Sequence, residues 1–230
     1  MTKIDWQNDQ ALFQLIQEEL YTAVVGDVMD RSGVVHQFLP PEIRPLSSDM
    51  FLVGRAMTVL AEDLPEEATV RQEQDTPFGL MLEALDDLKP GEVYVCVGSS
   101  PHYALWGELM STRAAKLGST GAVLEGYSRD TAGILRLNFP TFSYGPYAQD
   151  QSVRGRVVDF RCSISFRNNV QVKPGDLLIG DVDGVVAVPS EHERDVIERA
   201  LVKVRGENAV RAAIEDGMSA REAFDRYGVL

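Results

Sequence analysis

Residues 106–130 read WGELMSTRAAKLGSTGAVLEGYSRD, and this stretch decides how the chain folds. The helix formers between Gly107 and Gly118 predict a helix that begins at the first glycine and ends at the second. The apolar residues 121–124 then predict a short strand. Helices and strands alternate in the same way along the rest of the chain. We therefore predict an α/β fold in a single domain that spans residues 1–230.

The ends of these two elements carry groups that suit a small anionic substrate. A helix N-terminus presents unpaired N–H groups and a partial positive charge, which bind a carboxylate or a phosphate. Arg129 can grip a carboxylate through two hydrogen bonds, and Asp130 can hold a hard divalent cation. The residues alone also allow an ordinary helix, turn and strand with a solvated Arg129–Asp130 pair, so both interpretations stay open here.

Periodicity and turn residues predict the remaining elements. Helices are predicted over residues 9–20, 22–31, 77–88 and 191–215. Strands are predicted over residues 55–60, 92–97, 141–144, 177–180 and 185–188, the last two forming a hairpin around Asp181 and Asp183. Residues 153–166 form either one long strand or two strands separated by a bulge. Thr22 is the predicted cap of one helix, and Ser190 with Glu193 forms the predicted capping box of another.

Composition excludes several classes of function. The chain of 230 residues has a net charge of −13, which argues against a nucleic-acid partner. The longest apolar runs are too short to span a membrane, and the N-terminus lacks the apolar core of a signal peptide. Cys96 and Cys162 lie in apolar, strand-like runs, so we expect reduced thiols and a cytoplasmic location.

Two common chemistries are disfavoured by the residues present. The histidines lack the spacing of zinc ligands, and they are His36, His102 and His192. A Schiff-base enzyme needs a desolvated lysine, and no lysine has an apolar strand context; the lysines are Lys3, Lys89, Lys116, Lys173 and Lys203. The pair Asp181 and Asp183 lacks the further ligands of a calcium loop, which favours a structural hairpin turn.

Residues 106–112, Gly118, 121–123 and 126–130 together closely resemble the class II pyruvate aldolase family. This family contains the 4-hydroxy-4-methyl-2-oxoglutarate / 4-carboxy-4-hydroxy-2-oxoadipate aldolases and the regulator of ribonuclease E activity A. The likeness continues in order through three further segments and covers nearly the whole chain; they are residues 22–30, 173–189 and 217–228. The resemblance implies a layered β/β/α fold of the swivelling-domain type, assembled as a homotrimer or homohexamer.

The resemblance also implies an activity and a cofactor. The reaction is the metal-dependent retro-aldol cleavage of a 4-hydroxy-2-oxo acid, such as 4-hydroxy-4-methyl-2-oxoglutarate, to pyruvate and a second oxo compound. Oxaloacetate decarboxylation is expected as a side activity, because it passes through the same enolate. By resemblance, Asp130 is the direct protein ligand of Mg²⁺ or Mn²⁺, and Glu108 hydrogen-bonds a water on that metal; its other interpretation is a helix-start Glu that complements the dipole.

The same resemblance assigns the substrate contacts. Arg129 holds the pyruvyl part of the oxo-acid substrate and stabilises the enolate oxygen. Backbone N–H groups of Leu109 and Met110, after Gly107, receive the substrate carboxylate. In the aldolases a Glu from the long C-terminal helix of a neighbouring subunit takes part in proton transfer. Glu207 is the best positional match, although Glu193, Glu198 and Glu215 on the same predicted helix compete with it, and a solvated helical Glu is the alternative.

Some residues depart from the family pattern or stay unassigned. Glu125 stands where many members have Asp, which is either a neutral exchange or a difference in specificity. Arg71, Arg161 and Arg167 either contact a distal carboxylate of the substrate or lie on a solvated surface. Two other functions remain open. They are a non-catalytic, protein-binding regulator of the ribonuclease E inhibitor type, and a related lyase or hydratase that acts on another oxo or sugar acid.

Overall fold

A mixed β-sheet organises the protein, and the computed structural model describes residues 6–65 and 78–228. The strands lie in the order β1-β7-β5-β3-β2-β11-β12, and β8 pairs with the far half of β2. Their bounds are β1 (Arg44–Pro45), β2 (Leu52–Asp63), β3 (Glu92–Val97), β5 (Gly121–Leu124), β7 (Thr141–Ser143), β8 (Gly155–Phe160), β11 (Leu177–Asp181) and β12 (Gly184–Val188). Two short pairs accompany it, β4 (Ala104–Trp106) with β6 (Tyr127–Ser128) and β9 (Ile164–Ser165) with β10 (Gln171–Val172).

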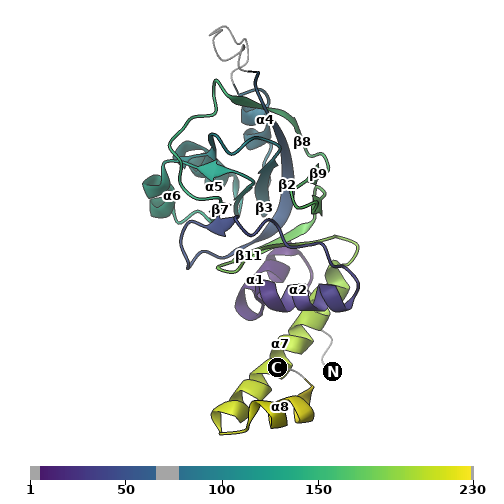
Figure 1. The fold of residues 1–230 in the computed structure, drawn as a ribbon. Coiled ribbons are helices and arrows are strands. Elements are labelled where there is room, and N and C mark those ends of the chain that lie inside the picture. Colours follow the sequence, from purple (N-terminus) through teal and green to yellow (C-terminus); the bar gives the residue numbers. More distant parts are fainter. Residues whose placement is uncertain (1–5, 66–77, 229–230) are drawn as a thin grey trace.

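The helices form two groups on the sheet (Figure 1). The first group is α1 (Asp9–Glu19), α2 (Thr22–Arg31) and α7 (Glu193–Glu215), which share a core with β11 and β12. The second group is α4 (Met81–Asp86), α5 (Glu108–Leu117) and α6 (Thr131–Leu137), which cover β3 and β5. The last helix, α8 (Ala220–Tyr227), packs mainly against α7.

Alternation along β3 separates two cores. Tyr94 and Cys96 point towards α4, α5 and α6, whereas Val93, Val95 and Val97 point to the opposite face. On that second face the sheet packs against β9 and β10. The order of layers is therefore a β-ribbon, the main sheet and the helices, which confirms the predicted layered β/β/α arrangement.

Parallel pairing brings the ends of several strands to one edge of the sheet. The pairs β2–β3, β3–β5 and β5–β7 are parallel. Each pair is joined by a helix on the same face, namely α4, α5 or α6. Parallel strands present their carboxyl ends together, and ligands bind preferentially at such edges. The N-terminus of α5 and the loop after β5 both lie there.

Two predicted helix caps are wrong because groups distant in sequence replace them. Thr22 is the first residue of α2, and its N–H and hydroxyl donate hydrogen bonds to Asp181 at 2.8 and 2.7 Å. The predicted hairpin is confirmed, since Asp181 pairs with Gly184 across β11 and β12. In α7, which begins at Glu193, the carboxylate of Glu193 binds Arg55 instead of closing a capping box with Ser190.

Positive φ angles explain two further differences from the predicted elements. The structure resolves the alternatives for residues 153–166 as two strands, separated at Arg161, where φ is 54°. The predicted helix over 77–88 is shorter, because Phe78 has a φ of 70° and α4 begins only at Met81. Pro77 lies outside the described residues.

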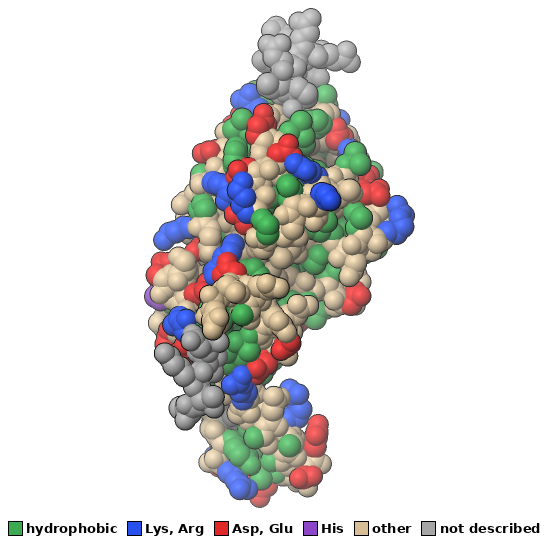
Figure 2. All heavy atoms as spheres, turned by 180° about the vertical axis from the view of Figure 1, so that it is seen from behind, with side chains coloured by type: hydrophobic (Ala, Val, Ile, Leu, Met, Phe, Trp, Pro, Cys, Tyr) green, Lys and Arg blue, Asp and Glu red, His purple; other side chains and the backbone are tan. Residues whose placement is uncertain are grey.

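The second half of α7 and α8 extend away from the sheet as an arm (Figure 1). Seen from behind, apolar and charged side chains alternate over this arm (Figure 2). Phe224 is 51% exposed there, and Ile214 is 39% exposed.

Cys96 and Cys162 are both free thiols. Among the described residues, none of the helices combines the length and the apolar character that crossing a bilayer requires.

Candidate functional site

The N-terminus of α5 is open towards the edge of the sheet. Gly107 precedes the helix in an extended conformation, and no side chain caps the first turn. The first hydrogen bond of the helix runs from the Ser111 N–H to the Gly107 carbonyl at 3.0 Å. The N–H groups of Leu109 and Met110 therefore have no partner within the helix. This is the position predicted for the substrate carboxylate.

The short strands β4 and β6 bring Arg129 and Asp130 to that helix terminus. The Arg129 N–H donates to the Trp106 carbonyl at 2.9 Å, which fixes the loop after β6 against the start of α5. A Cβ atom on Gly107 would lie 2.7 Å from Oδ2 of Asp130. A side chain at residue 107 would force the Asp130 carboxylate to shift, so the glycine permits this close approach.

Arg129 lies between two carboxylates. Its Nη1 is 2.8 Å from Oδ1 of Asp150, and its Nε is 3.7 Å from Oδ2 of Asp130. Burial alone would raise the pKa of Asp150, but hydrogen bonds from Ser152 and the charge of Arg129 outweigh burial, so this pKa lies below its usual value. Sequence reasoning missed Asp150, because it lies in a loop with no neighbouring motif.

These groups line a cavity of about 260 Å³. Its polar lining residues are Arg129, Asp130, Asp150 and Gln151. Most of the remaining wall is apolar, with Phe78, Met81, Leu82, Leu85, Leu105, Trp106, Leu109 and Met110 among its residues. A second hollow of about 270 Å³ adjoins it at Arg129 and Asp130. The structure thus brings Gly107, Leu109, Met110, Arg129 and Asp130 to one cavity, and their roles there stay predictions.

Asp130 fits a cation that keeps most of its water. Its side chain is 46% exposed and does not cap α6, so carboxylate lone pairs remain free. No group of three or more His, Cys, Asp or Glu suited to a metal occurs in the described part of the chain. One carboxylate with otherwise water ligands suits Mg²⁺ or Mn²⁺ and not a closed structural zinc site.

Glu108 lies beside the cavity and is not among its lining residues. Its carboxylate packs over Gly133 of α6, where a Cβ atom would overlap it. Its Oε1 is 3.5 Å from Nη2 of Arg136. Since the Gly133 N–H donates to the Asp130 carbonyl at 2.8 Å, Glu108 contacts the same helical turn that Asp130 begins. Its predicted hydrogen bond to a metal-bound water stays a prediction.

Glu207 lies on the second half of α7, which extends away from the sheet (Figure 1), and it is not among the residues that line the cavity at Asp130. Its Oε2 accepts a hydrogen bond from the Tyr21 hydroxyl at 2.8 Å, and its Oε1 is 3.2 Å from the Lys203 ammonium. Burial, together with Glu207, raises the pKa of Tyr21 to about 12. A single chain does not bring Glu207 to the other site residues, and its role across a subunit interface stays a prediction.

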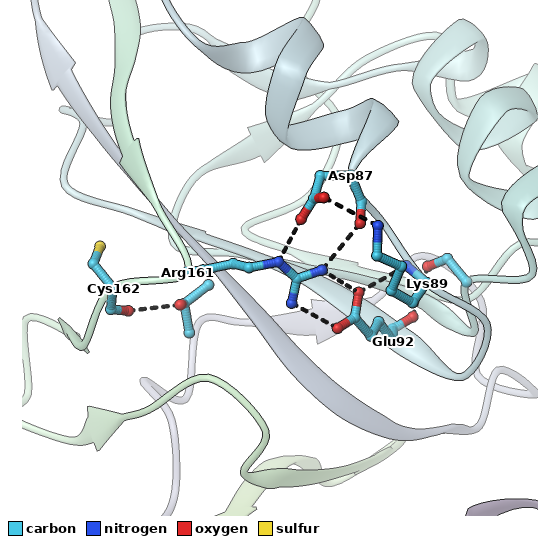
Figure 3. Close-up of polar contacts among 7 residues, drawn as sticks. Asp87, Lys89, Glu92, Arg161 and Cys162 are labelled. Atoms are coloured by element: carbon cyan, nitrogen blue, oxygen red, sulfur yellow. Dashed lines mark hydrogen bonds and ion pairs between the residues drawn. The ribbon is translucent and has the colours of Figure 1, made fainter.

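Two of the arginines considered for a distal carboxylate, Arg161 and Arg167, lie elsewhere. Arg161 binds Asp87 and Glu92 at the end of α4 and the start of β3 (Figure 3), with Nη1 2.7 Å from the Glu92 carboxylate. A guanidinium N–H of Arg167 donates to the Ser99 carbonyl at 2.7 Å. Neither arginine lines the cavity at Asp130. Arg71 lies outside the described residues.

Glu125 is buried behind the site, with only 2% of its surface exposed. Burial raises its pKa, although its Oε1 accepts a hydrogen bond from the Arg167 N–H at 2.6 Å. Glu125 is not among the residues that line the two hollows at Asp130. Having Glu125 where many family members have Asp therefore leaves the described part of the cavity wall unchanged.

Replacing Glu125 with glutamine should increase stability at high pH. A raised native pKa means that the folded protein holds the proton more tightly than the unfolded chain, so this stabilisation is lost as pH rises through the native pKa. The neutral amide of Glu125→Gln avoids that loss and can still accept the N–H of Arg167. Thermal unfolding of both proteins between pH 4 and pH 8 tests this. The difference in Tm between Glu125→Gln and the native protein should increase with pH. A difference in Tm that does not depend on pH would contradict this prediction.

Comparison with known proteins places this chain in a protein family. The sequence model of the RraA-like family, described as Aldolase/RraA, matches residues 22–187. A Halalkalibacterium halodurans protein named "Putative 4-hydroxy-4-methyl-2-oxoglutarate aldolase" is 29% identical over 88% of this chain and 89% of its own length. Protein DlpA of Legionella pneumophila is 27% identical over 90% of this chain, which spans only 32% of DlpA.

A solved structure shares the fold. Streptomyces coelicolor RraAS2, described as an unusual member of the RNase ES inhibitor RraA protein family, superimposes with a TM-score of 0.76. The superposition covers 90% of this chain and 100% of that protein, at 20% sequence identity. At this identity the likeness concerns the fold alone.

Proposed function

Because the chain belongs to the RraA-like (Aldolase/RraA) family, we propose that its cavity cleaves a 4-hydroxy-2-oxo acid into pyruvate and a second oxo compound. One observation carries the proposal: Arg129, Asp130 and the uncapped N-terminus of α5 line the same cavity. Together they form a site for the carboxylate and the 2-oxo oxygen of a pyruvyl group. The names of relatives such as the Halalkalibacterium halodurans protein support the same reaction class.

The chain's own residues bind and orient the pyruvyl part. The N–H groups of Leu109 and Met110 hold the carboxylate, and the guanidinium of Arg129 donates to the 2-oxo oxygen. A divalent cation held by Asp130 would supply Lewis-acid stabilisation of negative charge on that oxygen. Asp150 orients Arg129 from the other side through the contact of 2.8 Å. We propose that Mg²⁺ or Mn²⁺ fills this role.

Cleavage breaks the C3–C4 bond of the substrate. The C4 hydroxyl gives its proton to a base and becomes a carbonyl, and the electron pair of the broken bond forms the pyruvate enolate. Arg129 stabilises the charge that develops on the enolate oxygen. A proton added at C3 then yields pyruvate. Glu207 of a neighbouring subunit, in a homotrimer or homohexamer, remains our candidate for the proton transfers.

A coupled assay tests the proposal. Pyruvate release from 4-hydroxy-4-methyl-2-oxoglutarate and from oxaloacetate is followed with lactate dehydrogenase, first with Mg²⁺ and then with EDTA. Both substrates should be consumed, since both pass through the same enolate, and EDTA should abolish the activity. Absence of pyruvate from both substrates at saturating Mg²⁺ would contradict the proposed reaction.

Glu108→Gln should lower kcat/KM for oxaloacetate decarboxylation by about 10- to 100-fold, as outer contacts of metal ligands do. The amide carries no charge to hold a water on the cation. Gly133→Ala should act in the same direction, because the added methyl group displaces the Glu108 carboxylate. Glu18→Gln, at an exposed position on α1, is the matched control. Full activity of both test variants would exclude a role for Glu108.

A protein-binding regulator is the alternative function. The net charge of −13 could favour a basic partner, and the fold is shared with RraAS2. Such a protein needs an exposed surface but has no need for Arg129, Asp130 and an uncapped helix in one cavity. Their convergence favours catalysis. A lyase that acts on a sugar acid would use the same three features, and the assay above separates it by substrate.

A further inference from the structure

The cavity at Asp130 has two unequal ends. Its pyruvyl end holds Arg129, Asp130 and the N-terminus of α5. A further part of its wall, which we call the apolar end, is formed by α4 and the residues before it: Phe78, Met81, Leu82 and Leu85. In the proposed reaction the second oxo compound must leave from this side. The chemistry of the apolar end therefore decides which substrates fit.

Within residues 6–65 and 78–228, the apolar end offers no positive charge. Among the described residues that line the cavity, Arg129 is the one cation, and it lies at the pyruvyl end. Arg161 is bound to Asp87 and Glu92, and Arg167 donates to the Ser99 carbonyl. A second carboxylate placed against Met81 and Leu85 would lose its water without gaining a charged partner, which is strongly unfavourable.

Gln151 supplies one polar group at this wall. The residue is only 4% exposed, and its Nε2 has no hydrogen-bond partner among the described residues. Its backbone is held firmly, because its carbonyl accepts from the N–H groups of Arg154 and Gly155 at 2.7 and 3.0 Å. A buried donor without a partner is costly and rare. An oxygen atom of a bound substrate would accept the hydrogen bond that this donor lacks.

We propose that this site selects substrates whose second half is uncharged and apolar, and that Gln151 donates a hydrogen bond to the oxygen on C4. The preferred substrate class is a 4-hydroxy-2-oxo monocarboxylic acid with an alkyl or aryl group at C4, which releases pyruvate and an apolar aldehyde; dicarboxylic acids such as 4-hydroxy-4-methyl-2-oxoglutarate are cleaved less efficiently. This inference rests on the proposed aldolase function. The donor from Gln151 stabilises the charge that forms on the C4 oxygen as its proton leaves.

A matched pair of substrates tests the selection. 4-Hydroxy-2-oxohexanoate and 4-hydroxy-2-oxoglutarate differ in an ethyl group against a carboxylate at C4. With Mg²⁺, kcat/KM should be at least about tenfold higher for the hexanoate, which is a modest preference for an apolar pocket. An equal or higher value for the glutarate would overturn the inference.

Proton exchange at the pyruvate methyl group, followed by NMR in D₂O, separates this inference from the proposed function. Exchange needs only the pyruvyl end of the cavity. Exchange together with a preference for the glutarate would overturn the selection and leave the aldolase function standing. Absence of both exchange and cleavage would overturn the aldolase function, and the inference with it.

Two variants probe the residues directly. Gln151→Leu removes the donor at similar size, and the ratio of hexanoate cleavage to pyruvate exchange should fall about tenfold. Leu82→Arg places a cation at the apolar end, at a lining residue that is 55% exposed. It should raise the ratio of kcat/KM for the glutarate to that for the hexanoate about tenfold.

Gln37→Leu is the matched control for Gln151→Leu. Gln37 also has a buried side-chain oxygen without a partner among the described residues, but it lies beside β12, where its carbonyl accepts from the Ala187 N–H. It should change neither ratio. Unchanged ratios in both Gln151→Leu and Leu82→Arg would overturn the inference, and the exposed position of Leu82 keeps that test independent of folding.

Discussion

Replacing Arg129 with alanine should lower kcat/KM for pyruvate release by about 100- to 1,000-fold, the usual effect of removing one donor to a developing oxyanion. Arg129 is fixed at its backbone by the Trp106 carbonyl and at its side chain by Asp150. Its donors are therefore oriented before the substrate binds. Truncation removes the donors and leaves Asp130 and Asp150 without the cation between them. Steady-state kinetics with oxaloacetate measures the loss.

Two further variants sharpen this test. Arg129→Lys keeps the charge but loses the planar pair of donors, so it should recover only part of the activity. Arg221→Ala removes an arginine from α8, where it pairs with Asp225 on the same helix, and should retain full activity. Full turnover by Arg129→Ala in a folded protein would exclude the proposed clamp on the substrate.

Asp130→Asn should lower activity to the level that EDTA leaves in the native protein. Replacing the carboxylate removes the negative charge that anchors a hard cation, and neutral amide oxygens bind Mg²⁺ weakly on their own. The loss should be about 100-fold or more, in line with loss of several kcal/mol of charge stabilisation. Titration calorimetry with Mg²⁺ gives a second readout, in which the binding heat of the native protein disappears in the variant.

Asp216→Asn is a suitable control for Asp130→Asn, because Asp216 is exposed at the end of α7. It should bind Mg²⁺ and turn over oxaloacetate as the native protein does. If Asp130→Asn kept its activity, or if EDTA left the native protein fully active, a metal held by Asp130 would be excluded. The substrate would then depend on Arg129 and the α5 terminus alone.

Local signals predicted much of the fold and the centre of the site. The helix from Gly107 ends at Gly118 with a φ of 83°, as expected for a glycine stop, and β5 covers the four apolar residues that follow. The residues alone left the role of Arg129 and Asp130 open, and the family resemblance joined them to this helix; in the structure the helix follows β4 and the pair follows β6, which run parallel. The sequence is sufficient to predict where an element ends when the residue that caps it is adjacent in sequence.

Long-range partners could not be predicted in the same way. Ser190 and Glu193 have the spacing of a capping box, but Arg55, from β2, binds the Glu193 carboxylate. Thr22 looks like a cap, but Asp181 reaches it across 159 positions in the sequence. Asp150 and Gln151 follow the same rule, since only the folded loop brings them to Arg129. The spacing of residues within a motif does not show which side chains from distant parts of the sequence will bind them.

The left-handed backbone of Asp130, where φ is 57°, limits which residues can occupy this position. Glycine, asparagine and aspartate tolerate that conformation best, whereas longer side chains adopt it less readily. Aspartate is the sole anion among these three. Glutamate, its nearest chemical neighbour, would combine a steric penalty with a displaced charge. The turn thus narrows the evolutionary choice to a single acidic residue, and asparagine removes its charge while preserving both the side-chain size and the main-chain shape.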